Sequence, residues 1–285
     1  MTLDAAVAYD VWLRLIADEE LYRQTLAGTY RTYARELTEE QMRALDGFHA
    51  EPGLRWNIEN LRFRTALEAG STLASYLPRT IKMLTKGDDN WLQDIVFEYL
   101  ASHRWQEFGQ HRFAECNRFV AYIKDRIVKR RITPPHFDVV VDFEHAIVQL
   151  LQATGTAPAA AWTSARELPD DALVAATLTR GPAVAVIELP VDIRPWIESV
   201  DPTKGDVHER AVTLLAYVPS LTETHRIKAI GDGARIVLEA FDGRAPTQDV
   251  VARLAAAYDL DRDDVLGLVR PWLRDGVLAV VASPG

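Results

Sequence analysis

The chain contains 285 residues, of which 48% are hydrophobic and 26% charged, and it has a formal net charge of −9 at pH 7. This composition is typical of a folded protein in water, the length allows two domains, and the acidity excludes a general nucleic-acid binder. There is no apolar run of membrane-spanning length and no basic signal-peptide start, and the single Cys116 excludes an intramolecular disulfide, so we expect a cytoplasmic protein.

Residues 1–152 have helical periodicity throughout and predict an all-α bundle. Thr38 and Gln41 stand at the spacing of a capping box, in which two side chains satisfy the first amides of a helix. No stretch rich in β-branched residues interrupts this part of the chain. The predicted helices cover residues 4–17, 18–36, 38–50, 53–76, 78–86, 89–105, 109–130 and 136–152.

Residues 153–165 lose this periodicity and are rich in small residues, which is typical of a linker. The second predicted domain, residues 166–285, begins with short segments rich in β-branched residues and bounded by Pro and Gly. These segments predict strands that lie beside the elements following them as one extended sheet. The predicted strands cover residues 173–178, 183–189 and 211–218.

The last sixty residues predict a short strand over residues 225–230, three helices and a closing strand. Gly243 is expected to end the first helix, Thr247 to cap the second and Asp261 to cap the third. This is the order of elements in a winged helix-turn-helix. We therefore expect an α+β protein, in which an N-terminal helical bundle is followed by a C-terminal winged-helix domain.

The charges of this region favour a ligand other than DNA. Residues 226–285 contain 8 Lys and Arg against 9 Asp and Glu, whereas a helix that reads DNA meets phosphates with Lys and Arg. The third helix begins with Asp261, Asp263 and Asp264, where phosphate contacts would be made. A winged-helix transcription regulator is the alternative, but these charges favour a peptide-binding module.

The C-terminal segment resembles the PqqD-like domain, which recognises the leader peptides of ribosomally made, post-translationally modified peptides. The matching segments are Ile-Val-Leu-Glu-Ala-Phe-Asp-Gly at residues 236–243, then residues 247–258 and 265–278. Pro271 departs from the pattern because it removes an amide donor within the third helix.

The resemblance implies that a leader peptide adds as a strand to a sheet edge, beside apolar residues of the third helix. The strand is expected to offer backbone amides, that of Lys228 among them. The candidate peptide-binding residues are His225, Arg226, Ile227, Lys228, Ala229 and Ile230 on the strand, and Val265, Leu268, Val269 and Trp272 on the helix.

The N-terminal half is similar to the helical partner proteins of multinuclear non-haem iron-dependent oxidative enzymes, as found in methanobactin and 3-thiaglutamate pathways. The matching segments lie at residues 55–60, 73–82, 90–100 and 137–146. The resemblance implies a heterodimer with an iron enzyme that modifies a ribosomal precursor peptide, often at cysteine. The iron belongs to the enzyme, so this chain is expected to need no cofactor of its own.

Polar residues alternate with Trp56, Ile58, Leu61 and Phe63 along one predicted helix. This density of Arg and Asn is typical of a protein interface or a buried polar network, while salt bridging within and between helices is an equally good interpretation. The candidate interface residues are Arg55, Asn57, Asn60, Arg62 and Arg64.

No sequence motif indicates an active site. His103, Glu107 and His111 would share one face of an unbroken helix, but Gly109 lies between them and further metal ligands are missing, so a polar helix edge is the favoured interpretation. Cys116 has no paired cysteine and is expected to be a small buried residue. A metal-dependent enzyme using His103 and His111 remains a third hypothesis.

These patterns together favour an accessory protein that is not itself an enzyme. Its C-terminal domain would bind the leader of a precursor peptide, and its helical half would present the core, expected to contain cysteine, to an iron-dependent oxidative enzyme. No catalytic residue, metal ligand, nucleic acid or membrane is expected to take part, and a DNA-binding regulator is the alternative function.

Overall fold

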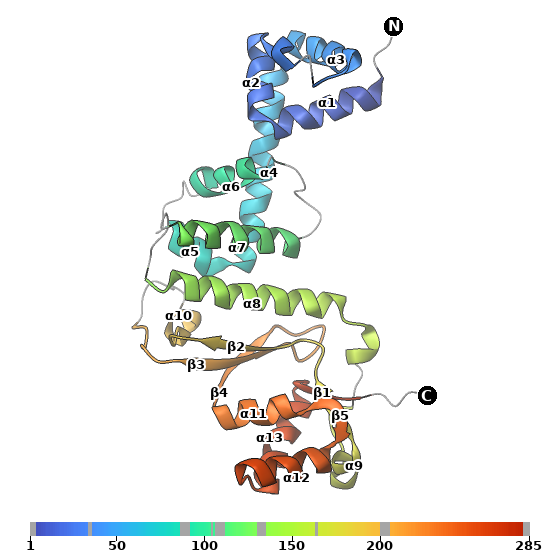
Figure 1. Ribbon diagram of the computed structural model, residues 1–285, viewed down its shortest axis with the longest axis vertical. Helices are drawn as coiled ribbons and strands as arrows, with labels where there is room; N and C mark the ends of the chain where they lie inside the picture. The colour runs from blue at the N-terminus through green and yellow to red at the C-terminus, as the bar shows by residue number, and fades with distance from the viewer. Residues whose placement is uncertain are drawn as a thin grey trace. The chain divides into compact units, whose positions relative to one another are not determined.

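The computed structural model describes residues 4–33, 36–85, 92–103, 105, 112–129, 135–162, 165–199 and 206–281. The chain divides into two compact units, residues 1–129 and 130–285 (Figure 1). In its described part the first unit is helical, and the second combines helices with two three-stranded antiparallel sheets. The expected mixture of helix and sheet is therefore confirmed.

Helix α8 (Phe137–Thr156) belongs to the second unit, although its periodicity continues that of the helices before it. It packs against strands β2 and β3 of that unit, so the units divide at residue 129 and not in the predicted linker 153–165. Residues 153–156 form the last turn of α8, and Ala159–Trp162 form the short 3-10 helix η3. Periodicity identifies a helix but not the surface on which it packs.

Within the described residues, two helices of the first unit differ from the sequence prediction. The predicted helix 18–36 ends at Ala27, where Gly28 adopts the left-handed conformation (φ 73°) that closes a helix. In place of the predicted helix 89–105, a π-helical segment runs into a short α-helix. The elements are α1 (Ala5–Ala17), α2 (Glu19–Ala27), η1 (Tyr30–Tyr33), α3 (Glu39–Ala50), α4 (Leu54–Tyr76), α5 (Pro78–Thr85), η2 (Leu92–Phe97), α6 (Glu98–Ser102) and α7 (Arg112–Val128).

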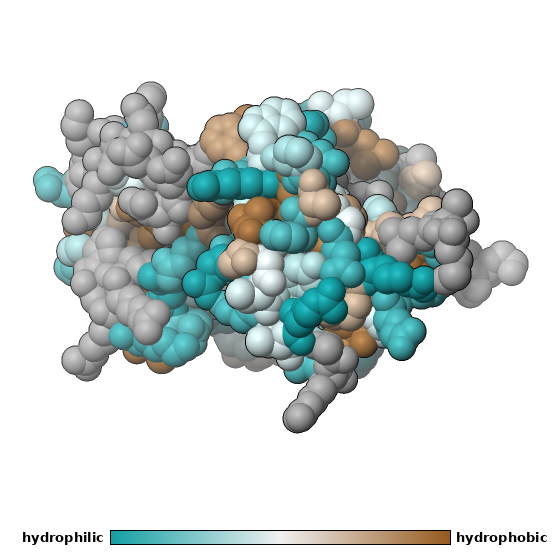
Figure 2. All heavy atoms as spheres, turned by 90° about the horizontal axis from the view of Figure 1, so that it is seen from above, coloured by the Kyte–Doolittle hydropathy of each residue, from teal (hydrophilic) through white to brown (hydrophobic). Residues whose placement is uncertain are grey.

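Helices α1 to α3 enclose a small apolar core with the start of α4, in which Leu15, Leu45 and Ile58 are completely buried. The predicted capping box is confirmed: the Thr38 hydroxyl accepts from the Gln41 amide, and the Gln41 side chain accepts from the Thr38 amide. Figure 2 shows one face of the molecule, on which the visible hydrophobic residues are scattered among hydrophilic ones.

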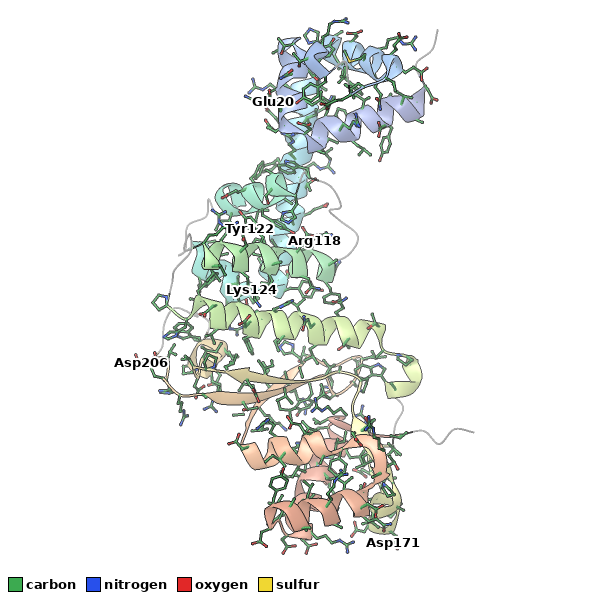
Figure 3. The ribbon with its side chains drawn as sticks, viewed as in Figure 1. Glu20, Arg118, Tyr122, Lys124, Asp171 and Asp206 are labelled. Carbon is green, nitrogen blue, oxygen red and sulfur yellow. The ribbon has the colours of Figure 1, made fainter. Side chains whose placement is uncertain are left out.

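Helices α4, α6 and α7 form a second group in this unit. Tyr99 of α6 is buried and packs edge-on against Phe119 of α7, with ring centroids 5.1 Å apart, and burial raises the pKa of Tyr99 to about 12. Arg126 of α7 pairs with Glu98 of α6 at 2.6 Å and also contacts Tyr122. Tyr122 and Arg118 both belong to α7 (Figure 3).

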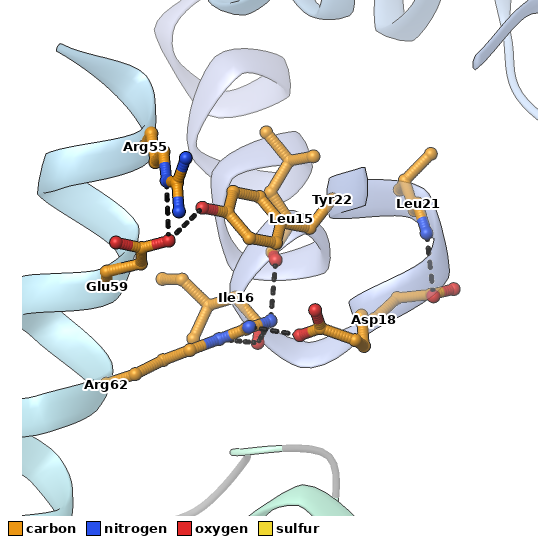
Figure 4. Close-up of polar contacts among 9 residues, drawn as sticks. Leu15, Ile16, Asp18, Leu21, Tyr22, Arg55, Glu59 and Arg62 are labelled. Atoms are coloured by element: carbon orange, nitrogen blue, oxygen red, sulfur yellow. Dashed lines mark hydrogen bonds and ion pairs between the residues drawn. The ribbon is translucent and has the colours of Figure 1, made fainter. Parts of the chain in front are cut away.

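Arg62 fastens the long helix α4 to the junction of α1 and α2 (Figure 4). Its guanidinium donates to the carbonyl oxygen of Ile16 at 2.8 Å and of Leu15 at 3.3 Å, and it pairs with Glu19. It also lies over the ring of Tyr22, 4.9 Å from the centroid. The carbonyls at the end of α1, which have no partner within their own helix, are thereby satisfied.

The second unit has two separate sheets, whereas the sequence predicted one. Strand order is β2-β3-β4 in one and β5-β1-β6 in the other. Of the predicted strands, 183–189, 211–218 and 225–230 are confirmed. The elements after α8 and η3 are α9 (Asp170–Ala175), β1 (Thr177–Arg180), β2 (Val184–Leu189), α10 (Arg194–Glu198), β3 (Val212–Tyr217), β4 (Arg226–Ile230), α11 (Asp232–Ala240), β5 (Asp242–Pro246), α12 (Thr247–Tyr258), α13 (Arg262–Arg274) and β6 (Leu278–Val280).

Strand β3 lies at the centre of its sheet and is buried on both faces. Leu215 and Tyr217 pack into the core formed with α11, α12 and α13, and Leu214 and Ala216 alternate onto the opposite face. That opposite face is covered by α8 (Figure 1). The sheet therefore forms the middle of three layers, and only its edges are available to other backbone.

The sheet of β5, β1 and β6 accounts for two differences from the sequence prediction. The predicted strand 173–178 is wrong, because the segment forms the short helix α9, with Leu173 buried, before β1 begins. Strand β5 was not predicted. Gly243 lies within it at φ 79°, and a Cβ there would come within 3.3 Å of Thr179 on β1, so the glycine permits the close pairing of the two strands.

The predicted helix signals in the last three helices have mixed outcomes. Gly243 does not end the first of them, because α11 ends at Ala240 and Gly243 lies within β5. Asp261 caps α13 by accepting from the Asp263 amide, as predicted. Thr247 does not cap α12, because its hydroxyl donates to the Ala176 carbonyl at 2.8 Å. Pro271 does not end α13, which continues to Arg274. Among the described helices, none is both long enough and apolar enough to cross a membrane.

Replacing Arg62 by Met should lower the unfolding free energy of the first unit by about 2–3 kcal/mol, because hydrogen bonds from a charged donor are worth about 1.5–3 kcal/mol. The matched control is Arg64→Met on the exposed face of the same helix, which should change stability by less than about 0.5 kcal/mol. Urea unfolding followed by circular dichroism measures both. Equal stability of the two variants would contradict the structural role of Arg62.

Candidate functional site

Strand β4 is an edge strand that contacts β3 and no other strand among the described elements. Arg226, Lys228 and Ala229 are exposed, and Ile227 and Ile230 are half-buried. An exposed edge presents backbone donors and acceptors that an added strand can satisfy. The structure thus places the predicted strand residues 226–230 at an accessible sheet edge, while His225 immediately precedes the strand.

The hydrogen-bonding pattern decides which residues of β4 direct their backbone N–H and C=O groups toward the open edge. The Val218 amide donates to the Ala183 carbonyl at 3.1 Å, next to the regular pairing of β2 with β3. Because the direction of backbone groups alternates along a strand, the even-numbered residues of β3 direct their N–H and C=O groups toward β2. The odd-numbered residues, Leu215 among them, then bond to their partners on β4.

Lys228 is the partner of Leu215 in this register, so its backbone groups face β3 and are already used. The expectation that the Lys228 amide is offered to a peptide is therefore wrong. Ile227 and Ala229 alternate with it and direct their N–H and C=O groups toward the open edge. The sequence identified the strand, but the assignment of its two edges depends on the register with β3.

The side chain of Lys228 links β4 to the end of α13. Its ammonium lies 3.1 Å from a carboxylate oxygen of Asp275, which also accepts from the Tyr217 hydroxyl at 3.0 Å. The ammonium is 5.4 Å from the centre of the Tyr217 ring. Burial acts to raise the pKa of Asp275, but hydrogen bonds from Lys228 and Tyr217 outweigh it, and the pKa lies below its ordinary value.

The helix residues predicted to line a groove are mostly core residues. Val265, Val269 and Trp272 are buried in the core of the second unit, and Leu268 is half-buried. They hold α13 in place, and Leu268 alone of the four keeps partly accessible surface. The acidic start of α13 is accessible, since Asp261, Asp263 and Asp264 are all exposed.

The residues predicted as a partner interface on α4 divide into two groups. Arg62 is buried and occupied at the α1–α2 junction, so it is not available to a partner. Arg55 is exposed and pairs with Glu59 at 2.9 Å. Asn57 and Arg64 are exposed and Asn60 is half-buried. The sequence analysis noted Trp56 and Phe63 between these polar residues but did not assign them to the interface, and both are exposed.

The remaining residues considered as metal ligands or nucleophiles have structural roles where they lie within the described residues. His103 ends α6 and its Nδ1 lies 2.9 Å from the Tyr99 carbonyl oxygen, whereas Glu107 and His111 lie outside the described residues. Cys116 is completely buried, as predicted, and burial raises the pKa of its thiol to about 12. Within the described ranges, no three His, Cys, Asp or Glu residues converge as a metal site.

Comparison with known proteins leaves the geometry of the chain as the main guide to its function. No family model matches the sequence, and no curated protein matches it.

Replacing Asp275 by Asn should destabilise the second unit most at neutral pH. Because the folded-state pKa of Asp275 is depressed, its stabilising contribution is present above the ordinary Asp pKa of about 3.9 and is lost as the pH falls through the folded value. The difference in unfolding free energy from the parent should therefore shrink as the pH falls below about 4. Urea unfolding at several pH values measures it, with the exposed Asp259→Asn as control; a pH-independent difference would contradict the assignment.

Proposed function

We propose that this chain is a non-catalytic partner protein that binds a ribosomally made precursor peptide through its leader and presents the core, expected to contain cysteine, to an iron-dependent oxidative enzyme. The observation that carries the proposal is the exposed edge of β4, where Ile227 and Ala229 direct outward backbone groups that no described residue uses. A leader peptide pairing with these groups would extend the sheet by one strand.

The order of elements around this edge supports a peptide-recognition domain. Helices α11, α12 and α13 follow β4 and lead into β6, as in a winged helix, and the sheet of β5, β1 and β6 would correspond to the wing. The exposed carboxylates at the start of α13 would repel a phosphate backbone. These features favour a peptide over DNA as the ligand.

Recognition would combine backbone pairing with side-chain contacts on the two faces of the sheet. Hydrogen bonds with Ile227 and Ala229 give affinity without sequence selectivity. Side chains of the added strand would alternate between the α8 side and the α13 side. On the α13 side they would lie beside Lys228 and the half-buried Ile230, whose side chains share that face of β4.

The first unit is proposed to bind the iron enzyme as a heterodimer. Its resemblance to the helical partners of such enzymes and the exposed polar residues Arg55, Asn57 and Arg64 of α4 support this assignment. The iron would be held by the enzyme. The chain itself would supply binding surfaces, one on each unit, and would bring the peptide core to the partner's metal.

Replacing Ala229 by Pro should lower leader affinity about tenfold, because it removes an outward amide and blocks the edge, and a tenfold change corresponds to about 1.4 kcal/mol. Binding of a fluorescently labelled candidate precursor peptide, measured by anisotropy, checks the prediction. Enzyme binding through the first unit should be unchanged.

Two matched variants isolate the edge effect. Ala229→Val keeps the amide at an exposed position and should bind leader normally. Lys228→Pro breaks a bond to β3 and should weaken the sheet itself, seen as a lower melting temperature. If a folded Ala229→Pro variant binds leader with unchanged affinity, or if the protein binds duplex DNA and no leader, the proposal is wrong.

Purified alone, the chain should contain far less than one iron or zinc per molecule, whereas its complex with the oxidative enzyme should contain iron. Elemental analysis of the two preparations measures this directly. One tightly bound metal per isolated chain, lost in His103→Ala, would indicate a metal-dependent enzyme and would contradict the accessory role.

A further inference from the structure

The side chains of β4 divide into a cationic set and an apolar set. Directly opposed residues of an antiparallel pair share one face of the sheet, and Arg226 and Lys228 stand opposite two β3 residues of the core on the α13 side. Both cations therefore lie on that side. Ile227 and Ala229 alternate with them and lie on the α8 side. Cationic and apolar positions thus alternate along the edge strand.

Lys228 is held in position from within the fold. Its ammonium lies 3.1 Å from Asp275 and 5.4 Å from the centre of the Tyr217 ring, and interactions with Tyr217 and Asp275 raise its pKa. The Asp275 side chain is only 18% exposed, whereas that of Lys228 is 56% exposed. Because an ammonium has three donors, Lys228 can bind Asp275 on its inner side and a second acceptor on its accessible side.

Arg226 supplies a second positive charge on the same face. Its side chain is 49% exposed, and its guanidinium pairs at 2.6 Å with Glu223 of the segment before the strand. Glu223 occupies part of a guanidinium that has five donors. Neither Glu223 nor Asp275 stands on β4, so the direct neighbours of an added strand on the α13 side would include Arg226 and Lys228.

The register of β4 gives residues opposite the two cations the closest side-chain contact. Because the backbone groups of Lys228 face β3, an added antiparallel strand would pair through Ile227 and Ala229. The added residues opposite Arg226 and Lys228 would then form non-hydrogen-bonded pairs, in which Cα atoms are about 4.5 Å apart and side chains are closest. A carboxylate at either position would lie beside a cation.

We propose that the leader segment bound at β4 has two acidic residues at alternate positions, which pair with Arg226 and Lys228, and apolar residues between them, which lie beside Ile227 and Ala229. This inference rests on the proposed function, because it names the class of peptide that the same edge selects. Backbone pairing would give affinity for any extended segment, and the side chains would select among segments. Cross-strand pairs of opposite charge are favourable, whereas like charges directly opposed are unfavourable.

A nucleic acid is a poorer match for this edge than an acidic peptide. Phosphates could meet the two cations, but they would leave the outward amides of Ile227 and Ala229 without a strand to pair with, and would place negative charge beside the outward carbonyl oxygens. An extended acidic segment matches the backbone groups and the cations together. The alternation of charged and apolar side chains is also the pattern of a β-strand.

The test uses the full-length protein and three short fluorescently labelled peptides in which valine alternates with threonine. In each peptide, two successive threonines are replaced by two glutamates, two glutamines or two lysines. Anisotropy should show that the glutamate peptide binds about tenfold more tightly than the glutamine peptide. The lysine peptide should bind more weakly than both.

Charge variants assign the preference to the two cations. Arg226→Gln and Lys228→Gln, confirmed as folded by circular dichroism, should each reduce the glutamate preference to about threefold if the two pairs contribute equally. The double variant should bind the glutamate and glutamine peptides equally, and Arg226→Glu should improve binding of the lysine peptide. The matched control is Arg244→Gln on β5, where the side chain is 86% exposed, and it should keep the full preference.

Ala229→Pro separates the acidic preference from strand addition, since blocking the edge should weaken all three peptides. Equal binding of the glutamate and glutamine peptides by the parent, lost in Ala229→Pro, would overturn the acidic preference and leave the proposed strand addition intact. A glutamate preference that survives in the double variant or in Ala229→Pro would place the acidic peptide elsewhere and overturn the inference.

Two further outcomes would also overturn it. If the parent binds none of the three peptides, the cations and the edge do not select an acidic strand, whereas the candidate precursor peptide still decides the proposed function. If duplex DNA displaces the glutamate peptide, and this displacement is lost in the double variant, Arg226 and Lys228 belong to a nucleic-acid site.

Discussion

Burial of strand β3 on both faces is the constraint on which the second unit depends. Leu214 and Leu215 are adjacent in sequence and both are inaccessible to solvent, so each face of the sheet must be covered by helices. Helix α8 covers one face and α11 to α13 cover the other. This requirement makes α8 part of the second unit and leaves backbone pairing possible only at the edges of the sheet.

The same constraint makes the two units suited to different tasks. In the second unit, a fixed central strand holds β4 in register, so that Ile227 and Ala229 face outward with their backbone groups while Lys228 is held to β3 and Asp275. In the first unit, Arg62 of α4 donates to a carbonyl oxygen at the end of α1. This contact buries one face of α4, and the opposite face is accessible. In each unit, an internal contact therefore decides which surface stays accessible.

The candidate surface at β4 depends on backbone groups that no described residue uses. At β4 these are the outward amides and carbonyls of an edge strand, which recognise backbone. Unsatisfied backbone groups are an open template for pairing with another strand, so their occurrence at an accessible edge points to a ligand that binds as extended backbone.

The sequence by itself determined the helical and strand periodicities and the position of strand 225–230. It also determined the capping box at Thr38 and the helix cap at Asp261. These features depend on neighbours a few residues away. Tertiary structure decided which surfaces these elements share. It placed Arg62 and Trp272 in the interior, gave Thr247 a partner at Ala176, and brought Gly243 close to Thr179. These outcomes depend on residues distant in the chain, and a register shifted by one residue would exchange the inner and outer edges of β4.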